Sequence, residues 1–462
     1  AAYQRATDSY GGVSDVYLRP NGVLNPVENS VPVAPSVEGK KTLRLSASPA
    51  NSGTVSGGGS FDKGSRVSIH AVASGRPCYN IDFAMAGEAD ARWRLARAAA
   101  DSDLILIEGV MGLFDGSDSV ADLAQRTGVA VLAVVDASAM GGTLGAIVHG
   151  LKTYRPGLPW AGVLANRVAS PRHAQMLQDG LLAAPDWLGA LPPLGGPGGT
   201  PLLPERHLGL VAAQELPDAL QRLDAAADAL AATPLGQLDA SAWQRWATPF
   251  APPPPAAPLP PLLAGRTIAV ARDAAFHFIY PANLRTLEQL GAQLVFFSPV
   301  AGDELPACDA LWLPGGYPEL HAPALAANER LRAQLHAHVQ AGKPLWAECG
   351  GLMALCESLT LLDGTAHRLW GLLPAQARMQ SRLAGLGPQQ LTLPAGTLRG
   401  HSFHYAQCDS RLPAVAHSQR PGTGSGAGAN CEPLYQQGSV RASFFHPWFA
   451  SDPRAAASLF GG

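Results

Sequence analysis

Pro344-Leu-Trp-Ala-Glu-Cys349-Gly350-Gly351-Leu-Met353 is an apolar run that breaks at a cysteine followed by two glycines. The pattern predicts a buried strand that turns sharply into a helix. A thiol on such a turn lies at the strand end, where the N–H groups and dipole of the next helix favour the thiolate. The glycines let a substrate approach the backbone closely. We therefore expect Cys349 to be a nucleophile; the alternative is a buried structural cysteine.

A second segment upstream has the pattern of a short strand that runs into a Pro-Gly-Gly turn: Asp309-Ala-Leu-Trp-Leu-Pro-Gly315-Gly316-Tyr317-Pro318-Glu319. Acyl chemistry at a cysteine places negative charge on a carbonyl oxygen, which backbone N–H groups can stabilise. We predict that Gly316 and Gly350 supply these donors and form an oxyanion hole. An ordinary β-turn is the alternative.

A third segment, Ser443-Phe-Phe-His446-Pro447-Trp448-Phe449, places a histidine in an aromatic strand. Histidine is the usual general base for an activated thiol, so His446 is our candidate for that role. Taken alone, a histidine in this setting is more often a structural residue of the core, so the assignment depends on the other two segments.

Strand and helix patterns alternate on both sides of a proline-rich stretch. This alternation is typical of βαβ units, so the predicted fold class is α/β, with two doubly wound, mostly parallel-sheet domains. A polyproline segment acts as a semi-rigid spacer. The expected divisions are an irregular or divergent segment 1–72, a first domain 73–247, a Pro-rich linker 248–263 and a second domain 264–462.

In the first domain, polar residues follow the ends of the predicted strands. Glu108 and Asp115 lie in Ile107-Glu-Gly-Val-Met-Gly-Leu-Phe-Asp-Gly116, and Asp136 and Asn166 follow the next two strands. Ligands bind at strand ends of doubly wound sheets, and an acid there can hold Mg²⁺ beside nucleotide phosphates. Each residue would equally serve as a cap of a turn.

Composition restricts the class of protein. The chain has 462 residues, 47% of them hydrophobic and 15% charged, and a formal net charge of -3. This charge gives no argument for a nucleic-acid partner, and we find no apolar stretch long enough to predict a membrane span. Six cysteines without a Cys-x-x-Cys pair favour neither a disulfide framework nor a zinc site. We expect a cytoplasmic protein, and a homodimer is one assembly open to it.

The Gly-Gly turn, the Cys-Gly-Gly elbow and the late histidine together resemble the class I glutamine amidotransferase domain, across about residues 265–455. The resemblance implies that Cys349 attacks the side-chain amide of L-glutamine and releases ammonia. Many members carry His-x-Glu as the last element, but Trp448 stands two residues after His446. The departure implies a Cys–His dyad.

Two strings narrow the resemblance to cobyrinic acid a,c-diamide synthases and cobyric acid synthases. They are Gly-Gly-Tyr-Pro-Glu at 315–319 and Gly400-His401-Ser-Phe-His404-Tyr405. His401 and His404 thereby become rivals of His446 as the base, although the family pattern gives them a structural or substrate-side place.

Within the first domain, the stretch from about Ala73 to Leu210 resembles the ATP-dependent synthetase domain of the a,c-diamide enzymes. Among the matching strings are Ser74-Gly-Arg-Pro77, Asn80-Ile-Asp82 and the string that contains Glu108 and Asp115. The resemblance implies ATP and Mg²⁺ as cofactors, with Glu108 as the metal ligand, Asp115 as a second acid and Asn166 at the nucleotide base. It implies cobyrinate or hydrogenobyrinate as the acceptor.

Residues 1–72 depart from this family. The nearest counterpart of its phosphate-binding loop, Ala34 to Thr42, lacks the first glycine and is one residue short. Two acids of a further family string are absent from Lys63 to Ser68. Two alternatives therefore accompany the synthase: a relative with a decayed ATP site that acts as a glutaminase or binds corrins, and an enzyme that amidates other corrin carboxylates, as cobyric acid synthase does.

Overall fold

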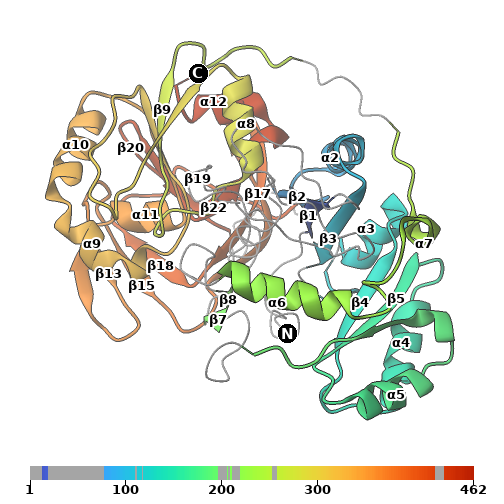
Figure 1. Cartoon of the computed structure of the whole chain (residues 1–462). Coiled ribbons are helices and arrows are strands. Elements are labelled where there is room, and N and C mark those ends of the chain that lie inside the picture. Colours follow the sequence, from blue (N-terminus) through green and yellow to red (C-terminus); the bar gives the residue numbers. More distant parts are fainter. Residues whose placement is uncertain are drawn as a thin grey trace. The chain divides into compact units, whose positions relative to one another are not determined.

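The computed structural model describes residues 13–18, 78–109, 112–116, 118–195, 205–206, 209–210, 219–251, 258–421 and 431–461. The chain divides into two compact units (Figure 1). The described residues of the first unit are 13–18, 78–81 and those from 92 to 251; those of the second are 82–91 and those from 258 to 461.

The first unit contains a parallel sheet of β4 (Val131–Asp136), β5 (Trp160–Asn166) and β6 (Trp187–Ala190), in that order. Leu144, Val148 and Leu177 of the connecting helices pack against this sheet to form a small core. Strand β1 (Val13–Leu18) pairs antiparallel with both β2 (Tyr79–Ile81) and β3 (Leu104–Gly109). The other elements are most of α2 (Glu88–Asp101), which belongs to this unit from Arg92 on, and α3 (Val120–Thr127), α4 (Thr143–Thr153), α5 (Pro171–Asp179), α6 (Ala219–Ala231), α7 (Ala240–Trp243), β7 (Glu205–Arg206), β8 (Gly209–Leu210) and the 3₁₀ helices Ala184–Asp186 and Gln244–Trp246.

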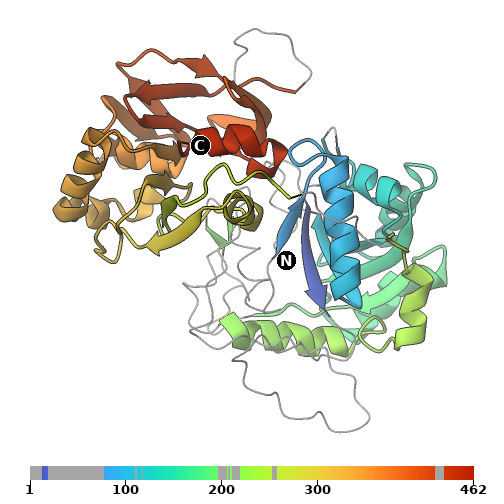
Figure 2. The same ribbon diagram turned by 90° about the horizontal axis from the view of Figure 1, so that it is seen from above.

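The second unit is built on a seven-stranded sheet of order β10-β9-β11-β12-β21-β20-β19. Its first five strands run parallel; β20 pairs antiparallel with β21, and β19 pairs antiparallel with β20. The bounds are β9 (Thr267–Ala271), β10 (Gln293–Phe297), β11 (Ala310–Leu313), β12 (Leu345–Glu348), β19 (Ala416–His417), β20 (Pro433–Gln437) and β21 (Val440–Ser443). Figure 2 shows helices packed around these strands. They are α8 (Pro281–Gln289), α9 (Ala322–Ala327), α10 (Glu329–Gln340), α11 (Gly350–Leu355), α12 (Pro453–Ser458) and the 3₁₀ helices Pro318–Leu320 and Phe449–Ser451.

Two smaller sheets complete this unit, of order β14-β13-β15-β18 and β16-β17-β22. Their strands are β13 (Ser358–Thr360), β14 (Ala366–Arg368), β15 (Ala375–Met379), β16 (Gly385–Leu393), β17 (Gly396–His404), β18 (Ala406–Ser410) and β22 (Phe445–Pro447). The main core joins aromatic and aliphatic side chains of the large sheet and its helices, among them Trp312, Trp346 and Phe449.

The predicted α/β class is confirmed, with parallel pairing in both units. The antiparallel pairing of β1 was not expected, and it places one strand inside the segment 1–72 that the sequence pattern left irregular. The rest of that segment before Cys78, including Ala34 to Thr42, lies outside the described residues.

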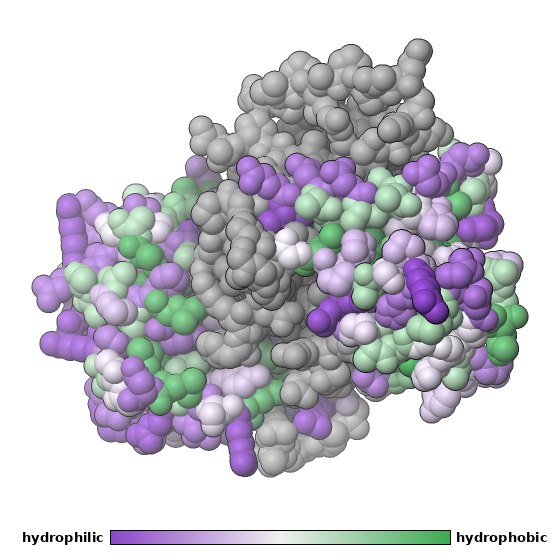
Figure 3. Space-filling model, turned by 60° about the horizontal axis from the view of Figure 1, so that its bottom comes forward, coloured by the Kyte–Doolittle hydropathy of each residue, from purple (hydrophilic) through white to green (hydrophobic). Residues whose placement is uncertain are grey.

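The predicted linker 248–263 is described only in part, because residues 252–257 lie outside the described residues. Its last residue, Leu263, is fully buried in the core of the second unit, and its N–H donates to the Leu290 carbonyl at 2.8 Å. The predicted domain boundaries stay a prediction. On the face in Figure 3, hydrophilic and hydrophobic residues are interspersed. None of the described helices is long and apolar enough to cross a membrane.

Candidate active site

Cys349 occupies the turn between β12 and α11. Its φ of 48° and ψ of -106° lie in a region that non-glycine residues rarely adopt. Two backbone hydrogen bonds stabilise this conformation. The Cys349 N–H donates to the Ser443 carbonyl of β21 at 2.8 Å, and the Cys349 carbonyl accepts from the Met353 N–H at 3.0 Å. The chain therefore makes the predicted strand–turn–helix, with a strained residue at the turn.

The Pro-Gly-Gly turn after β11 lies directly against this elbow. A Cβ on Gly350 would lie 2.9 Å from the Gly316 nitrogen, so the two backbones are in contact. Gly316 has a φ of 155°, and a Cβ there would collide with the Ala275 carbonyl. A Cβ on Gly315 would likewise collide with the His446 ring. The structure thus places Gly316 against Gly350, next to Cys349, and His446 against Gly315 of the same turn.

His446 lies on β22 with a carboxylate beside it that the sequence analysis did not select. Its Nδ1 is 3.9 Å from Oε1 of Glu348, and both side chains are buried. The Trp346 indole N–H donates to the other Glu348 oxygen at 3.1 Å. Burial raises the pKa of Glu348, while His446 and Trp346 lower it. Glu348, the residue before Cys349, therefore adds a third ionisable group to the predicted Cys–His dyad.

The sequence contains a sign that Glu348 has a role in the site: it is a charged residue that ends the apolar run Leu345-Trp-Ala-Glu348. An acid at the end of a buried strand needs a partner. Trp448, two residues after His446, is buried against the Tyr280 ring, at 5.0 Å between centroids.

The surroundings of Cys349 do not favour the thiolate in the way the sequence pattern suggested. Burial raises the pKa of the thiol, and the charges of Glu319 and Glu348 raise it further; only the Gly350 N–H lowers it appreciably. We expected the start of the helix to lower this pKa overall. That expectation is wrong, because the effects that raise the pKa outweigh the Gly350 N–H. A thiol held protonated requires a base that takes its proton.

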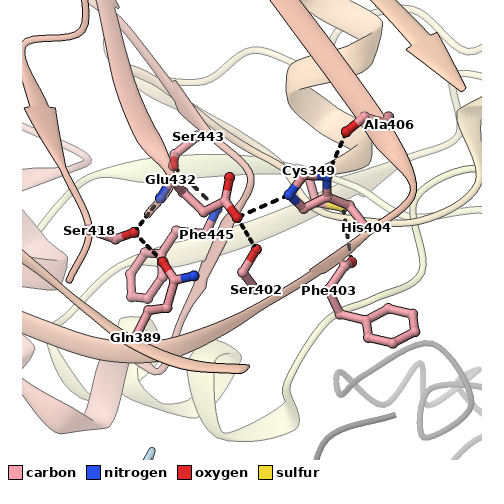
Figure 4. A network of polar contacts seen from close by, with 10 residues as sticks. All are labelled: Cys349, Gln389, Ser402, Phe403, His404, Ala406, Ser418, Glu432, Ser443 and Phe445. Carbon is pink, nitrogen blue, oxygen red and sulfur yellow. Dashed lines mark hydrogen bonds and ion pairs between the residues drawn. The ribbon is translucent and has the colours of Figure 1, made fainter. Parts of the chain in front are cut away.

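His404 is poorly placed to be that base. Its Nδ1 lies 2.7 Å from the Ala406 carbonyl and its Nε2 lies 3.0 Å from Oε1 of Glu432 (Figure 4). Because both ring nitrogens face acceptor oxygens, neither directs a lone pair at the thiol. The Cys349 sulfur instead lies 4.0 Å from the Phe403 carbonyl of the same strand.

A buried polar network holds the His404–Glu432 pair in place. Oε1 of Glu432 also accepts from the Ser402 hydroxyl, and the Glu432 N–H donates to the Ser418 hydroxyl at 2.7 Å. The Ser418 hydroxyl in turn donates to Gln389 (Figure 4). These contacts join residues distant in sequence and give His404 a structural role beside the nucleophile.

His401 packs against the proposed base. It pairs with His446 across β17 and β22, and the two rings stack at 5.0 Å between centroids, inclined by 16°. The hydroxyl of Tyr280 lies 2.8 Å from Nδ1 of His401. His401 therefore fixes the plane of the His446 ring from behind.

In the first unit, the candidate ligand residues at the strand ends are Glu108, Asp115, Asp136 and Asn166, and the structure shows only the last two as neighbours. Asp136 and Asn166 are neighbours in register at the ends of β4 and β5. The Asp136 carboxylate pairs with Arg167 at 3.1 Å and accepts from the Ser138 N–H, and Asn166 accepts from the Arg167 N–H at 2.9 Å.

Glu108 lies near the end of β3, and Asp115 is exposed in the segment that follows. Their oxygens are of the kind that Mg²⁺ prefers. Across the part of the chain that the structure describes, however, no three acidic, histidine or cysteine side chains are grouped to hold a metal ion. The carboxylates of Glu108 and Asp115 are therefore suitable ligands for Mg²⁺, but the described residues alone do not form a complete metal site.

Comparison with known proteins agrees with this geometry. Residues 267–454 match the model of the CobB/CobQ-like glutamine amidotransferase domain. The chain is similar over most of its length to two proteins named hydrogenobyrinate a,c-diamide synthase. That of Stutzerimonas stutzeri (strain A1501) is 51% identical over 391 residues, which are 85% of this chain and 87% of the relative. That of Pseudomonas aeruginosa is 49% identical, over 85% of this chain and 86% of the relative. The cobyrinate a,c-diamide synthase of Herminiimonas arsenicoxydans is 44% identical, over 84% and 85%.

Proposed function

Because the chain belongs to the hydrogenobyrinate and cobyrinate a,c-diamide synthase family, we propose that it catalyses the glutamine-dependent, ATP-driven amidation of the a and c acetate carboxylates of cobyrinate or hydrogenobyrinate, in cobalamin biosynthesis. The observation that carries the proposal is the convergence of Cys349, Gly316, His446 and Glu348 at one edge of the second unit's sheet.

The second unit would release ammonia from L-glutamine. His446 takes the thiol proton as the Cys349 sulfur bonds to the amide carbon of glutamine. The N–H groups of Gly316 and Gly350 stabilise the oxyanion. His446 then protonates the departing nitrogen, the C–N bond breaks, and ammonia leaves a thioester on Cys349. Water, deprotonated by His446, hydrolyses the thioester to glutamate.

Glu348 acts on His446 rather than on the substrate. A carboxylate next to Nδ1 holds the ring orientation and stabilises the imidazolium that forms when the thiol proton is transferred. The raised pKa of the thiol increases the need for this support, because a nearby positive charge stabilises the thiolate.

In the first unit, bound ATP with Mg²⁺ would supply the phosphoryl group that turns a carboxylate into a reactive acyl donor. The residues proposed to hold them are Glu108 for the metal, Asp115 as a second acid and Asn166 at the nucleotide base. Oxygen and amide chemistry supports each role.

The test is to incubate the purified chain with ATP, Mg²⁺, glutamine and either hydrogenobyrinate or cobyrinate, and to measure phosphate release and the mass of the corrin. Two added amides would support the proposal. Glutamine hydrolysis without phosphate release would favour the alternative, a glutaminase or corrin-binding relative with a decayed ATP site, for which the altered Ala34 to Thr42 segment argues. Amides on other side chains would indicate activity like that of cobyric acid synthase.

The cytoplasm remains the proposed location, since no cysteine of this chain takes part in a disulfide in the structure. The homodimer also stays a prediction, which a mass measurement by light scattering in solution would test.

A further inference from the structure

Two cysteines that the proposed chemistry does not use face each other at the far end of the nucleophile's helix. Cys356 directly follows α11, and Cys408 lies in the middle of β18. Their sulfur atoms are 4.0 Å apart. Cys356 is buried, whereas Cys408 is partly exposed, so a small reagent reaches the pair from the Cys408 side.

Backbone contacts hold the two residues side by side. Cys408 pairs with Ala377 of β15, and the N–H of Glu357, next to Cys356, donates to the Ala375 carbonyl of the same strand at 2.8 Å. Both cysteines are thus anchored to β15. A disulfide requires sulfur atoms about 2.05 Å apart, so each sulfur needs to move by only about 1 Å.

We propose that Cys356 and Cys408 are a modification site that forms a reversible disulfide with a disulfide oxidant of the glutathione type. The Cys408 thiolate attacks one sulfur of oxidised glutathione, a protein–glutathione disulfide forms, and one reduced glutathione leaves. The Cys356 thiolate then attacks the Cys408 sulfur and expels the second reduced glutathione. Two protein thiols are oxidised and one glutathione disulfide is reduced to two thiols.

The position of the pair gives the bond a consequence for the site. Helix α11 begins directly after Cys349 and ends directly before Cys356, and all six of its residues are buried. Cys408 lies four residues after His404, on the strand that follows β17, and the Phe403 carbonyl of β17 faces the Cys349 sulfur. The disulfide would pull together two elements that flank the nucleophile. Because misplacement of about 1 Å can cost about 100-fold in rate, we expect at least a tenfold loss of glutaminase activity. This consequence rests on the proposed function, whereas the disulfide itself does not.

The bond is tested first without reference to activity. The Cys349→Ala variant, which removes the nucleophilic thiol, is incubated with oxidised glutathione and digested, and the peptides are identified by mass. The expected product is a peptide pair joined through Cys356 and Cys408 that separates on reduction. The matched Cys349→Ala/Cys408→Ser variant should not yield it. Failure to form this pair, or pairing of Cys356 with another cysteine, overturns the proposal.

The consequence is tested on the chain with Cys349 intact. Glutaminase activity should fall on treatment with oxidised glutathione, recover with dithiothreitol and resist the treatment in Cys408→Ser; Cys408→Ala replaces that variant if the serine prevents folding. Equal inactivation of both proteins would show that the oxidant acts elsewhere and would overturn the link to the site. If no glutaminase activity exists at the outset, the proposed function fails while the peptide result still decides the disulfide.

Discussion

Replacing Glu348 with glutamine tests whether the carboxylate beside His446 is part of the machinery. The substitution keeps the shape of the side chain and removes its charge. At 3.9 Å, a unit charge pair in a protein environment of effective dielectric constant about 20 interacts with about 4 kcal/mol. Since each 1.36 kcal/mol corresponds to a factor of ten, loss of this interaction in the transition state would slow glutamine hydrolysis by about 1,000-fold.

One effect opposes this loss. The charge of Glu348 raises the pKa of Cys349, so its removal makes the thiolate easier to form. We therefore expect Glu348→Gln to lower kcat for glutamine hydrolysis by about 100- to 1,000-fold, with little change in KM. Folding should not suffer, because burial raises the pKa of Glu348 and the neutral amide removes a buried charge.

The assay is glutamate formation from glutamine, together with the melting temperature of each variant. Glu357→Gln is the matched control, because that carboxylate is partly exposed and pairs with Arg411 at 2.6 Å, away from the base; the activity of this variant should be unchanged. A Glu348→Gln enzyme with kcat within threefold of the unsubstituted chain would refute the reasoning. A large drop in melting temperature would show instead that the carboxylate serves the fold.

Three further predictions concern the same site. Cys349→Ala should abolish glutamine-dependent amidation yet allow amidation with added ammonia, and retained use of glutamine would remove Cys349 from the nucleophile's role. His446→Ala should abolish glutaminase activity, whereas His404→Ala should keep measurable activity while it lowers the free energy of unfolding by about 3–5 kcal/mol, because it leaves Glu432 buried without its ion-pair partner; glutamate formation by the folded fraction of each variant separates the roles, and the opposite pattern of activity would make His404 the base. Burial raises the pKa of Glu319 to about 7, above its usual 4.5, so this group favours the folded state below pH 4.5 and that contribution is lost as pH rises through 7. Glu319→Gln should therefore raise the melting temperature at pH 8 more than at pH 5, and an equal shift at both pH values would contradict the assignment.

The turn at Cys349 could be predicted because its signals are local. An apolar strand, a cysteine and two glycines lie within ten residues, and the glycines are required by contacts that a Cβ would block. The choice between His404 and His446 could not be made in this way. Both lie in aromatic strands, and what separates them is their partners, Glu432 for one and Glu348 for the other. These partners are set by strand pairing over long sequence distances.

The error over the thiol pKa has the same origin. The local pattern contains the helix start and its N–H groups, which do act as expected through Gly350. It does not show how strongly burial acts on the thiol, nor that Glu319, from the turn after β11, and Glu348 both place negative charge near the sulfur. Burial of the thiol and the charges of these two acids, one from a separate turn and one from the adjacent residue, together outweigh the Gly350 N–H.

The two acids differ in what proton transfer does for them. When His446 takes the thiol proton, Glu348 gains a positive neighbour at 3.9 Å, whereas Glu319 gains only a negative sulfur. The repulsion that Glu348 exerts on the thiolate is therefore offset in the same step, and that of Glu319 is not. A buried thiol with a raised pKa remains compatible with nucleophilic catalysis because the imidazolium that forms with the thiolate is stabilised by the Glu348 carboxylate 3.9 Å away.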